Sequence, residues 1–311
     1  MTRDAAGHVA AFDALMAPVD HALHVPAGLL DPPAVTVLPG ARSHLQVPFA
    51  EVNGARALRL DVHLPDRAGD DPWPAVLYVH GGSFLTGLPG MGPWTTLPDR
   101  GIAVVSVTYR LAGEAPFPAA VADVRAALDW VRARAGRYGL DPGRTALWGG
   151  SAGGYLAALV GVSPGMPLAR RPRLLGATRL ADPVAPAAVV TQYAVTDPTR
   201  LRADALPGAE AAADALAAAT TPFFGEDPDP RAVLDHVEHG AVLPRFLVMH
   251  GDADARVGPA QGRRLHEGLV GAGARSTYVV VPGADHGTPE WSAPPVVAAV
   301  VDHLTSAWST P

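Results

Sequence analysis

Cysteine is absent from this chain of 311 residues, which excludes disulfide bridges, thiolate metal sites and a cysteine nucleophile together. Charge is sparse as well. The formal net charge is −6, with no basic stripe for nucleic acid and no polybasic anchor for an anionic membrane. No apolar run approaches the length of a membrane span, and residues 1–9 lack the uninterrupted apolar segment of a signal peptide. We therefore expect a cytoplasmic bacterial protein that has no membrane span and no nucleic-acid partner.

Cofactor and metal motifs are also missing from the sequence. The chain has no H-E-x-x-H, no P-loop and no G-x-G-x-x-G that opens a first βαβ unit. We therefore expect no cofactor and no metal ion. Hydrophobic residues make up 48% of the chain, which is long enough to bury a large core. These properties fit one α/β domain with a small insertion.

A serine between small residues is the most informative feature that is present. Residues 149–153 read Gly-Gly-Ser-Ala-Gly, after the strand-like Thr145–Trp148 and before the helix-like Tyr155–Val160. Small residues at this spacing suit a sharp strand-to-helix turn that pushes the Ser151 hydroxyl out above the sheet. The following helix points backbone N–H groups at any anion that forms there. The motif alone is a weak signal, and its strand–turn–helix context strengthens it.

A serine nucleophile needs a base, an orienting acid and an oxyanion site, and the chain offers each of them after a predicted strand. His80–Phe84 reads His-Gly-Gly-Ser-Phe, and its glycines let backbone N–H groups approach a substrate carbonyl, as in the oxyanion loop of lipases and esterases. Asp254 and His286 each follow a later apolar run. Ligands of parallel sheets bind at the carboxyl ends of the strands. The chain order Ser151, Asp254, His286 is the order of α/β-hydrolases.

Three aspartates compete for the role of the acid. Asp285 adjoins His286, and neighbouring residues seldom orient each other's side chains well. Asp252 lies nearer its strand, and we predict that it holds the loop by accepting hydrogen bonds from backbone N–H groups. Asp254 is therefore preferred. His80 is interpreted as a structural residue that pins the oxyanion loop, and the remaining histidines are interpreted as solvated or packing residues, among them His63, His236, His239, His250 and His303.

Several motifs together resemble those of hormone-sensitive-lipase-like and bacterial feruloyl-esterase-like carboxylesterases. They are His80–Phe84, Val105–Leu111, Phe117–Ala120, Tyr138–Asp141, Gly149–Gly154, His250–Asp254 and Gly283–Gly287. The resemblance covers about Leu58 to Leu304 and implies an α/β-hydrolase fold, with a mostly parallel, doubly wound sheet flanked by helices and a small cap-like insertion. It also implies functional residues, namely Ser151 as nucleophile, Asp254 as acid, His286 as base, and oxyanion donors near Gly82, Ser83 and Ala152.

Two positions depart from the family pattern. Relatives usually carry a third glycine where this chain has Ser83, and commonly an acidic residue where it has Gly150. Ser83 still supplies a backbone N–H, so the oxyanion site survives if a residue with a Cβ can reach the required φ and ψ. A glycine before the nucleophile changes the polarity beside it. Neither departure removes a member of the Ser-His-Asp set.

The chain divides, on this interpretation, into an N-terminal arm or lid segment at 1–47 and a hydrolase domain at 48–311. A cap-like insertion is predicted at about 197–235, with a helix rich in alanine near 210–219. Apolar residues of such an insertion can line an acyl or alcohol pocket. A surface excursion without substrate contact is an equal alternative. Aromatic candidates for the pocket, for each of which core packing is at least as good an explanation, are Phe84, Trp94, Phe223, Phe224 and Trp291.

The functional hypothesis is a serine carboxylic-ester hydrolase that forms an acyl-enzyme with a small-molecule ester of small to medium size. One alternative uses the same residues for acyl transfer, or for a non-hydrolytic cyclisation or lyase step in a biosynthetic pathway. A peptidase is disfavoured because no propeller-like domain precedes the hydrolase portion, and a non-catalytic ligand-binding module is disfavoured by the intact Ser, Asp and His. A homodimer through an edge strand or the C-terminal helix is left open by analogy with this architecture.

Overall fold

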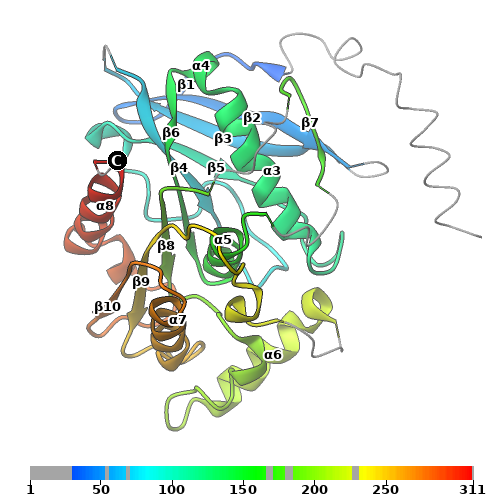
Figure 1. The fold of residues 1–311 in the computed structure, drawn as a ribbon, viewed down its shortest axis with the longest axis vertical. Helices are drawn as coiled ribbons and strands as arrows, with labels where there is room; N and C mark the ends of the chain where they lie inside the picture. The colour runs from blue at the N-terminus through cyan, green and yellow to red at the C-terminus, as the bar shows by residue number, and fades with distance from the viewer. Residues whose placement is uncertain are drawn as a thin grey trace, which may run out of the picture.

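The computed structural model describes residues 30–52, 56–67, 71–165, 171–178, 185–225 and 231–309 (Figure 1). Most of the predicted N-terminal arm, residues 1–29, lies outside the described residues. The part that is described does not form a separate arm. The predicted boundary at 47/48 falls inside strand β2 (Ala41–Glu51), which pairs antiparallel with β3 (Leu58–Pro65). Residues 35–47 therefore belong to the sheet of the hydrolase domain.

One sheet holds the described strands together, in the order β1-β2-β3-β5-β4-β6-β8-β9-β10, with the short β7 pairing with β2 at the side. Neighbours from β5 to β10 are parallel, and β1, β2 and β3 join them as an antiparallel extension. This arrangement confirms the predicted mostly parallel sheet. The remaining strands are β1 (Val35–Leu38), β4 (Trp73–Val79), β5 (Ala103–Val107), β6 (Leu140–Gly150), β7 (Arg173–Leu174), β8 (Ala188–Gln192), β9 (Arg245–Gly251) and β10 (Ser276–Val281).

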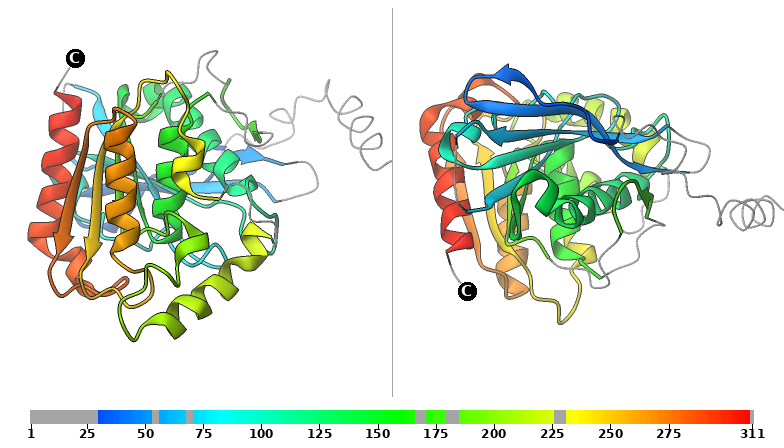
Figure 2. Two further views of the ribbon diagram at one scale, coloured as in Figure 1. Left: turned by 60° about the horizontal axis from the view of Figure 1, so that its bottom comes forward. Right: turned by 90° about the horizontal axis from the view of Figure 1, so that it is seen from above.

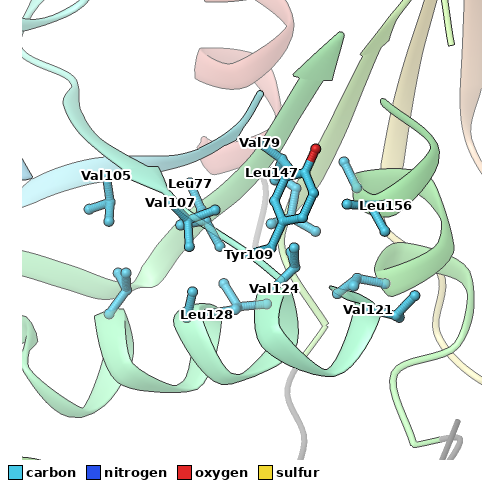
Figure 3. Packing of buried hydrophobic residues seen from close by; sticks show 14 of the residues in the cluster. Leu77, Val79, Val105, Val107, Tyr109, Val121, Val124, Leu128, Leu147 and Leu156 are labelled. Atoms are coloured by element: carbon cyan, nitrogen blue, oxygen red, sulfur yellow. The ribbon is translucent and has the colours of Figure 1, made fainter. Parts of the chain in front are cut away.

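Helices cover both faces of the sheet. Strands β4, β5 and β9 are nearly unbroken apolar runs because each packs against side chains on both sides. On one face, α3 packs Val121, Val124 and Leu128 against the sheet together with Leu156 of α5 (Figure 3). On the other face lies α8, and β9 and β10 run between α8 and α7 (Figure 2). The bounds are α3 (Ala119–Ala133), α4 (Ala135–Tyr138), α5 (Ala152–Val162), α6 (Glu210–Phe224), α7 (Ala260–Gly271) and α8 (Pro294–Trp308).

The predicted insertion lies between β8 and β9. It contains η3 (Pro198–Arg200), α6 and η4 (Val233–His236), with residues 226–230 outside the described part. Leu201, Ala213 and Leu216 form a small core of their own with Val257 from the loop after β9. The far end of α6 carries Phe223 into the main core. The insertion is therefore anchored to the domain at both ends.

Strand β3 is more buried than its alternating sequence predicts. Residues 58–64 alternate between apolar and polar side chains, which predicts a half-exposed strand. None of the residues of β3 is exposed, because its leucines and Val62 lie in the main core on one face and His63 packs against Trp94 on the other. His63 is consequently buried, 3% exposed, with its Nδ1 2.8 Å from the Ser43 hydroxyl and its ring 4.6 Å from that of Trp94. Burial lowers the pKa of His63 from 6.5 to about 4, so the ring is neutral in the folded protein at neutral pH.

Acid should destabilise the fold through His63. The unfolded chain takes up a proton on this ring below a pH of 6.5 and the folded chain only near a pH of about 4, so the free energy of unfolding falls as pH drops through that interval. We expect a contribution of about 3 kcal/mol, since each unit between the two pKa values corresponds to about 1.4 kcal/mol. Urea unfolding of wild type and His63→Gln at pH 7 and pH 4.5 measures it.

The glutamine variant is the control, because its amide can hydrogen-bond to Ser43 and does not titrate. Other histidines with a lowered pKa, such as His80 and His303, are present in both proteins, and their contributions cancel in the comparison. We expect a smaller acid-induced loss of stability in the variant. Equal losses in the two proteins would contradict this assignment.

Candidate active site

Ser151 lies in a strained turn between β6 and α5. Its backbone has φ 52° and ψ −121°, a conformation that residues with a Cβ rarely adopt. The turn is possible because its neighbours are small. A Cβ on Gly149 would collide with the backbone of Gly153, and a Cβ on Gly153 would collide with the backbone carbonyl of Val79. The Ser151 N–H donates to the carbonyl of Gln192 in β8 at 2.9 Å, which fixes the turn to the neighbouring strand.

The side chains of Ser151, His286 and Asp254 form a continuous hydrogen-bonded chain. His286 Nε2 lies 2.9 Å from Ser151 Oγ, and His286 Nδ1 lies 2.9 Å from Asp254 Oδ2. The three residues follow the carboxyl ends of β6, β10 and β9, so the sheet brings Ser151 together with two residues that lie more than 100 positions later in the sequence. Asp254 is fully buried and Ser151 is 7% exposed. A serine, an imidazole and a carboxylate so linked can activate the hydroxyl for nucleophilic attack.

Asp254 is held as a carboxylate by its surroundings. Its Oδ1 accepts hydrogen bonds from the backbone N–H groups of Arg256 at 3.0 Å and Val257 at 2.9 Å. Burial raises its pKa, but the bonds to His250 and His286, the charge of His286 and the Val257 N–H outweigh burial and hold the pKa well below its usual range. A permanently ionised acid beneath the imidazole can stabilise a positive charge on it.

The two competing aspartates have other partners. Asp252 Oδ1 accepts from the Gly283 N–H at 2.6 Å, the type of loop contact that the sequence predicts for it. Asp285 Oδ1 accepts from the N–H of Ala255 at 2.9 Å and from that of His286 at 2.6 Å. Both carboxylates therefore tie the loop after β9 to the loop after β10. The hydrogen bonds of these two carboxylates thus go to backbone groups, whereas Asp254 bonds to the imidazole of His286.

The oxyanion-type loop packs directly against the serine turn. A Cβ on Gly81 would lie 3.0 Å from the Gly150 carbonyl oxygen and 3.3 Å from Ser151 Cβ. The Gly82 carbonyl accepts from the N–H groups of Leu85 at 2.9 Å and Thr86 at 3.1 Å, which closes the loop into a tight turn. Ser83 adopts the left-handed conformation with φ 55°. The conformation that the missing third glycine would favour is thus reached by a serine, at a cost of about 1–2 kcal/mol.

His80 sits under this loop as a packed residue. It is 1% exposed, its ring stacks on that of Tyr109 at 4.5 Å, and its Nδ1 lies 2.8 Å from the Gly81 carbonyl oxygen. The Tyr109 hydroxyl donates to the His80 carbonyl at 3.0 Å. Burial lowers the pKa of His80. These contacts agree with a structural role for His80 beneath the loop.

The aromatic residues predicted as substrate contacts are in the core instead. Phe84 and Phe223 are fully buried, and their rings stack face to face at 4.0 Å with 2° between the planes. Phe224 is 9% exposed and meets Phe84 edge to face at 5.3 Å. Phe84 and Phe223 thus pack in the core in this conformation, which agrees with the core packing that the sequence leaves open for both. Their stacking instead connects α6 of the insertion to the oxyanion-type loop.

Two residues near the site are given no role in it by the sequence analysis, which interprets His250 as a solvated or packing residue and does not name Tyr193. His250 is fully buried, its Nε2 lies 2.8 Å from the Val257 carbonyl and 3.4 Å from Asp254 Oδ2, and it thereby supports the acid. Tyr193 follows β8 and places its ring 4.9 Å from the ring of His286. The spacing of His250 and Asp254 in one loop motif is a usable signal for the first. No local pattern indicates the second, because its partner lies far along the chain.

The described part of the chain contains no group of three or more histidines, aspartates and glutamates placed to hold a metal ion. Among the described helices, none is long and apolar enough to cross a membrane.

A mostly parallel sheet with helices on both faces and a serine turn after β6 defines the α/β-hydrolase fold. The chain belongs to the BD-FAE family, whose model matches residues 60–269, and this confirms the resemblance that the motifs carry.

Relatives and solved structures agree with this assignment. The chain is 30% identical to the esterase LipQ of Mycobacterium tuberculosis over 240 residues, which cover 75% of this chain and 55% of LipQ. It thus spans little more than half the length of that relative. A propionate-bound thermophilic esterase, Est2 of Thermogutta terrifontis, is 25% identical with a TM-score of 0.62, covering 88% of this chain and 93% of that one. A carbohydrate esterase from gut microbiota, in truncated form, shares the fold at 23% identity with a TM-score of 0.72, covering 89% of this chain and 100% of its own.

Proposed function

We propose that this protein is a serine carboxylic-ester hydrolase in which Ser151, His286 and Asp254 act as a catalytic triad on esters of small to medium size. The observation that carries the proposal is the chain of two 2.9 Å hydrogen bonds from Ser151 through His286 to the buried Asp254. Membership of the BD-FAE family and the names of the relatives, which are esterases, support the reaction class.

The first half-reaction uses His286 as a general base. Asp254 accepts a hydrogen bond from the Nδ1–H group and so fixes the tautomer in which Nε2 is free to accept the proton of Ser151. As that proton moves to Nε2, Oγ bonds to the ester carbonyl carbon and the carbonyl oxygen becomes an oxyanion. The positive imidazole lies against the ionised Asp254. The tetrahedral intermediate then collapses, and the alcohol leaves with the proton from Nε2.

The oxyanion needs donors that are already in place. We assign this role to the backbone N–H groups near Gly82 and Ser83 and to that of Ala152, the first residue of α5, where helix geometry leaves the N–H without an intrahelical partner. Each donor of this kind can contribute about 3–4 kcal/mol to the transition state. In the second half-reaction, His286 takes a proton from water as the water attacks the acyl carbonyl carbon. Ser151 then leaves with the proton from Nε2, and the acid is released.

Both departures from the family pattern have a packing explanation within this proposal. Ser83 retains the left-handed backbone of the loop, and Gly150 leaves the space that the Tyr193 ring fills. Neither therefore favours acyl transfer, cyclisation or lyase chemistry over hydrolysis. Ester hydrolysis is the one function proposed.

Hydrolysis of p-nitrophenyl esters from acetate to long acyl chains tests the substrate class. We expect turnover that is highest with short acyl chains, in agreement with the propionate bound to Est2 of Thermogutta terrifontis. A fluorophosphonate probe should label the protein once and abolish the turnover. Labelling without turnover on any ester would exclude a general esterase while leaving an active serine, whereas neither labelling nor turnover would contradict the proposal as a whole.

A further inference from the structure

Tyr193 stands between the loops that carry the three proposed catalytic residues. It follows β8 directly, with a φ of 40° that is unusual for a residue with a side chain. Its N–H donates to the Met249 carbonyl in β9 at 3.0 Å. A backbone held in this conformation by the neighbouring strand directs the ring to one fixed place.

The ring forms one wall of the His286 site. Its centroid lies 4.9 Å from that of the His286 imidazole, with 71° between the two ring planes, and 4.6 Å from the centroid of the Trp291 ring. Trp291 is itself fixed, because its Nε1 donates to the Asp285 carbonyl at 2.8 Å, one residue before His286. Tyr193 is therefore wedged between the imidazole and a side chain that is bonded to the same loop.

Gly150 explains how the ring can occupy this place. A Cβ at position 150 would lie 2.7 Å from the Tyr193 Oη and 2.9 Å from its Cζ, closer than such atoms approach in proteins. Gly150 immediately precedes Ser151, so the ring touches the turn of the nucleophile on one side and the base on the other. The Tyr193 ring can therefore occupy its place because residue 150 has no side chain.

The hydroxyl of Tyr193 stays protonated at neutral pH. Burial, together with the negative charge of Asp254, raises the pKa of Tyr193 to about 12. The residue is thus neutral at neutral pH, and its observed contact with His286 is the one between the two rings.

We propose that Tyr193 is a positioning residue, which keeps the His286 imidazole in line with Ser151, and that Gly150 is the glycine this requires. The inference rests on the proposed function, since the alignment matters only if His286 relays the proton. The bond from Nδ1 to Asp254 holds one corner of the imidazole and leaves the ring able to swing. The flat wall of Tyr193 restricts that swing and keeps Nε2 at 2.9 Å from Ser151 Oγ.

Replacement of the ring tests the proposal. Tyr193→Leu should lower kcat for p-nitrophenyl acetate by about 10- to 100-fold with little change in KM, because small misplacements of a catalytic group cost about that much. Tyr193→Phe keeps the aromatic ring beside His286. Its kcat should stay within about threefold of wild type, a much smaller change than that expected for Tyr193→Leu. Tyr278→Leu is the matched control, since it removes another half-buried tyrosine ring, one that stacks on His266 away from the site.

A double variant tests the link to position 150. Gly150→Ala alone should lower kcat by pushing the ring toward His286. In the Tyr193→Leu background the same change should cost much less, because the clash is gone, so the two effects are not multiplicative. Independent, multiplicative effects or an undiminished kcat in Tyr193→Leu would overturn the proposal.

A readout that does not depend on ester turnover separates this inference from the proposed function. The His286 Nδ1 proton, bonded to Asp254, should give a downfield proton NMR resonance that Tyr193→Phe retains and Tyr193→Leu broadens or shifts. If wild type shows no esterase activity, the proposed function fails while the resonance still reports whether Tyr193 orders the imidazole. An unchanged resonance in Tyr193→Leu contradicts the positioning role in either case.

Discussion

Replacement of Ser151 by alanine should abolish ester hydrolysis, with a fall in kcat of about 10⁵-fold or more, comparable to the loss of a nucleophile in other triads. The physical reason is the removal of Oγ, the atom that forms the acyl-enzyme bond. The side-chain hydrogen bond of Ser151 in the described structure is the one with His286, and alanine keeps the backbone of the turn. The fold should therefore be retained, with a melting temperature near that of wild type.

A second serine supplies the control for this experiment. Ser276→Ala removes a hydroxyl that bonds to His266 at 2.9 Å, at the opposite end of β10 from the loop of His286. It should hydrolyse p-nitrophenyl acetate at the wild-type rate. Full activity in a folded Ser151→Ala protein would refute the assignment of the nucleophile.

Exchange of Asp254 for asparagine should lower kcat by about 10⁴-fold through the tautomer of His286. The asparagine carbonyl can keep the two bonds from the N–H groups of Arg256 and Val257, which leaves its amide nitrogen facing Nδ1. An amide nitrogen donates and does not accept. The imidazole must then accept at Nδ1 and carry its proton on Nε2, where it can no longer take the proton of Ser151.

Asp252→Asn is the matched control for the acid. Asp252 accepts one backbone hydrogen bond, from Gly283, and an asparagine carbonyl accepts the same bond. Activity should stay within a few-fold of wild type. If Asp252→Asn were the inactive variant and Asp254→Asn the active one, the acid would have been assigned to the wrong residue of the loop after β9.

The elements that place the site were predictable because each obeys a local rule. Apolar runs of strand length are visible in the sequence at β4, β5 and β9, and Val121, Val124 and Leu128 have the spacing of one face of a helix at α3. Ser151, Asp254 and His286 could be expected to converge because each follows a strand of a parallel sheet. That expectation needed only the order of the elements along the chain.

The remaining features depend on contacts between distant segments, which no local pattern contains. The alternation in β3 predicts a half-exposed strand, but side chains from distant segments cover it on both faces of the sheet. Phe84 and Phe223 suit a pocket or a core equally well by sequence, and only the folded chain stacks one on the other. No local sequence pattern predicts that Tyr193 lies beside His286, since 93 positions separate the two residues. The ring contacts the imidazole only after β8, β9 and β10 are paired.

The insertion packs against the oxyanion-type loop through an aromatic contact. Because Phe223 of α6 stacks on Phe84, the insertion supports the loop to which we assign two oxyanion donors. Changes in this aromatic cluster would act on the backbone of Ser83 and Phe84, both of which have left-handed φ values. The insertion and the oxyanion-type loop are therefore packed as one unit in this conformation.

Trapping the acyl-enzyme tests the central claim most directly. Wild-type protein is mixed with p-nitrophenyl acetate, quenched in acid within the first turnover, digested and analysed by mass spectrometry. The mechanism predicts an acetyl group on Ser151 and a release of p-nitrophenol at least equal to it, both missing in Ser151→Ala. Release of p-nitrophenol without any acetylated Ser151, or with the acetyl group on another residue whose removal stops turnover, would contradict it.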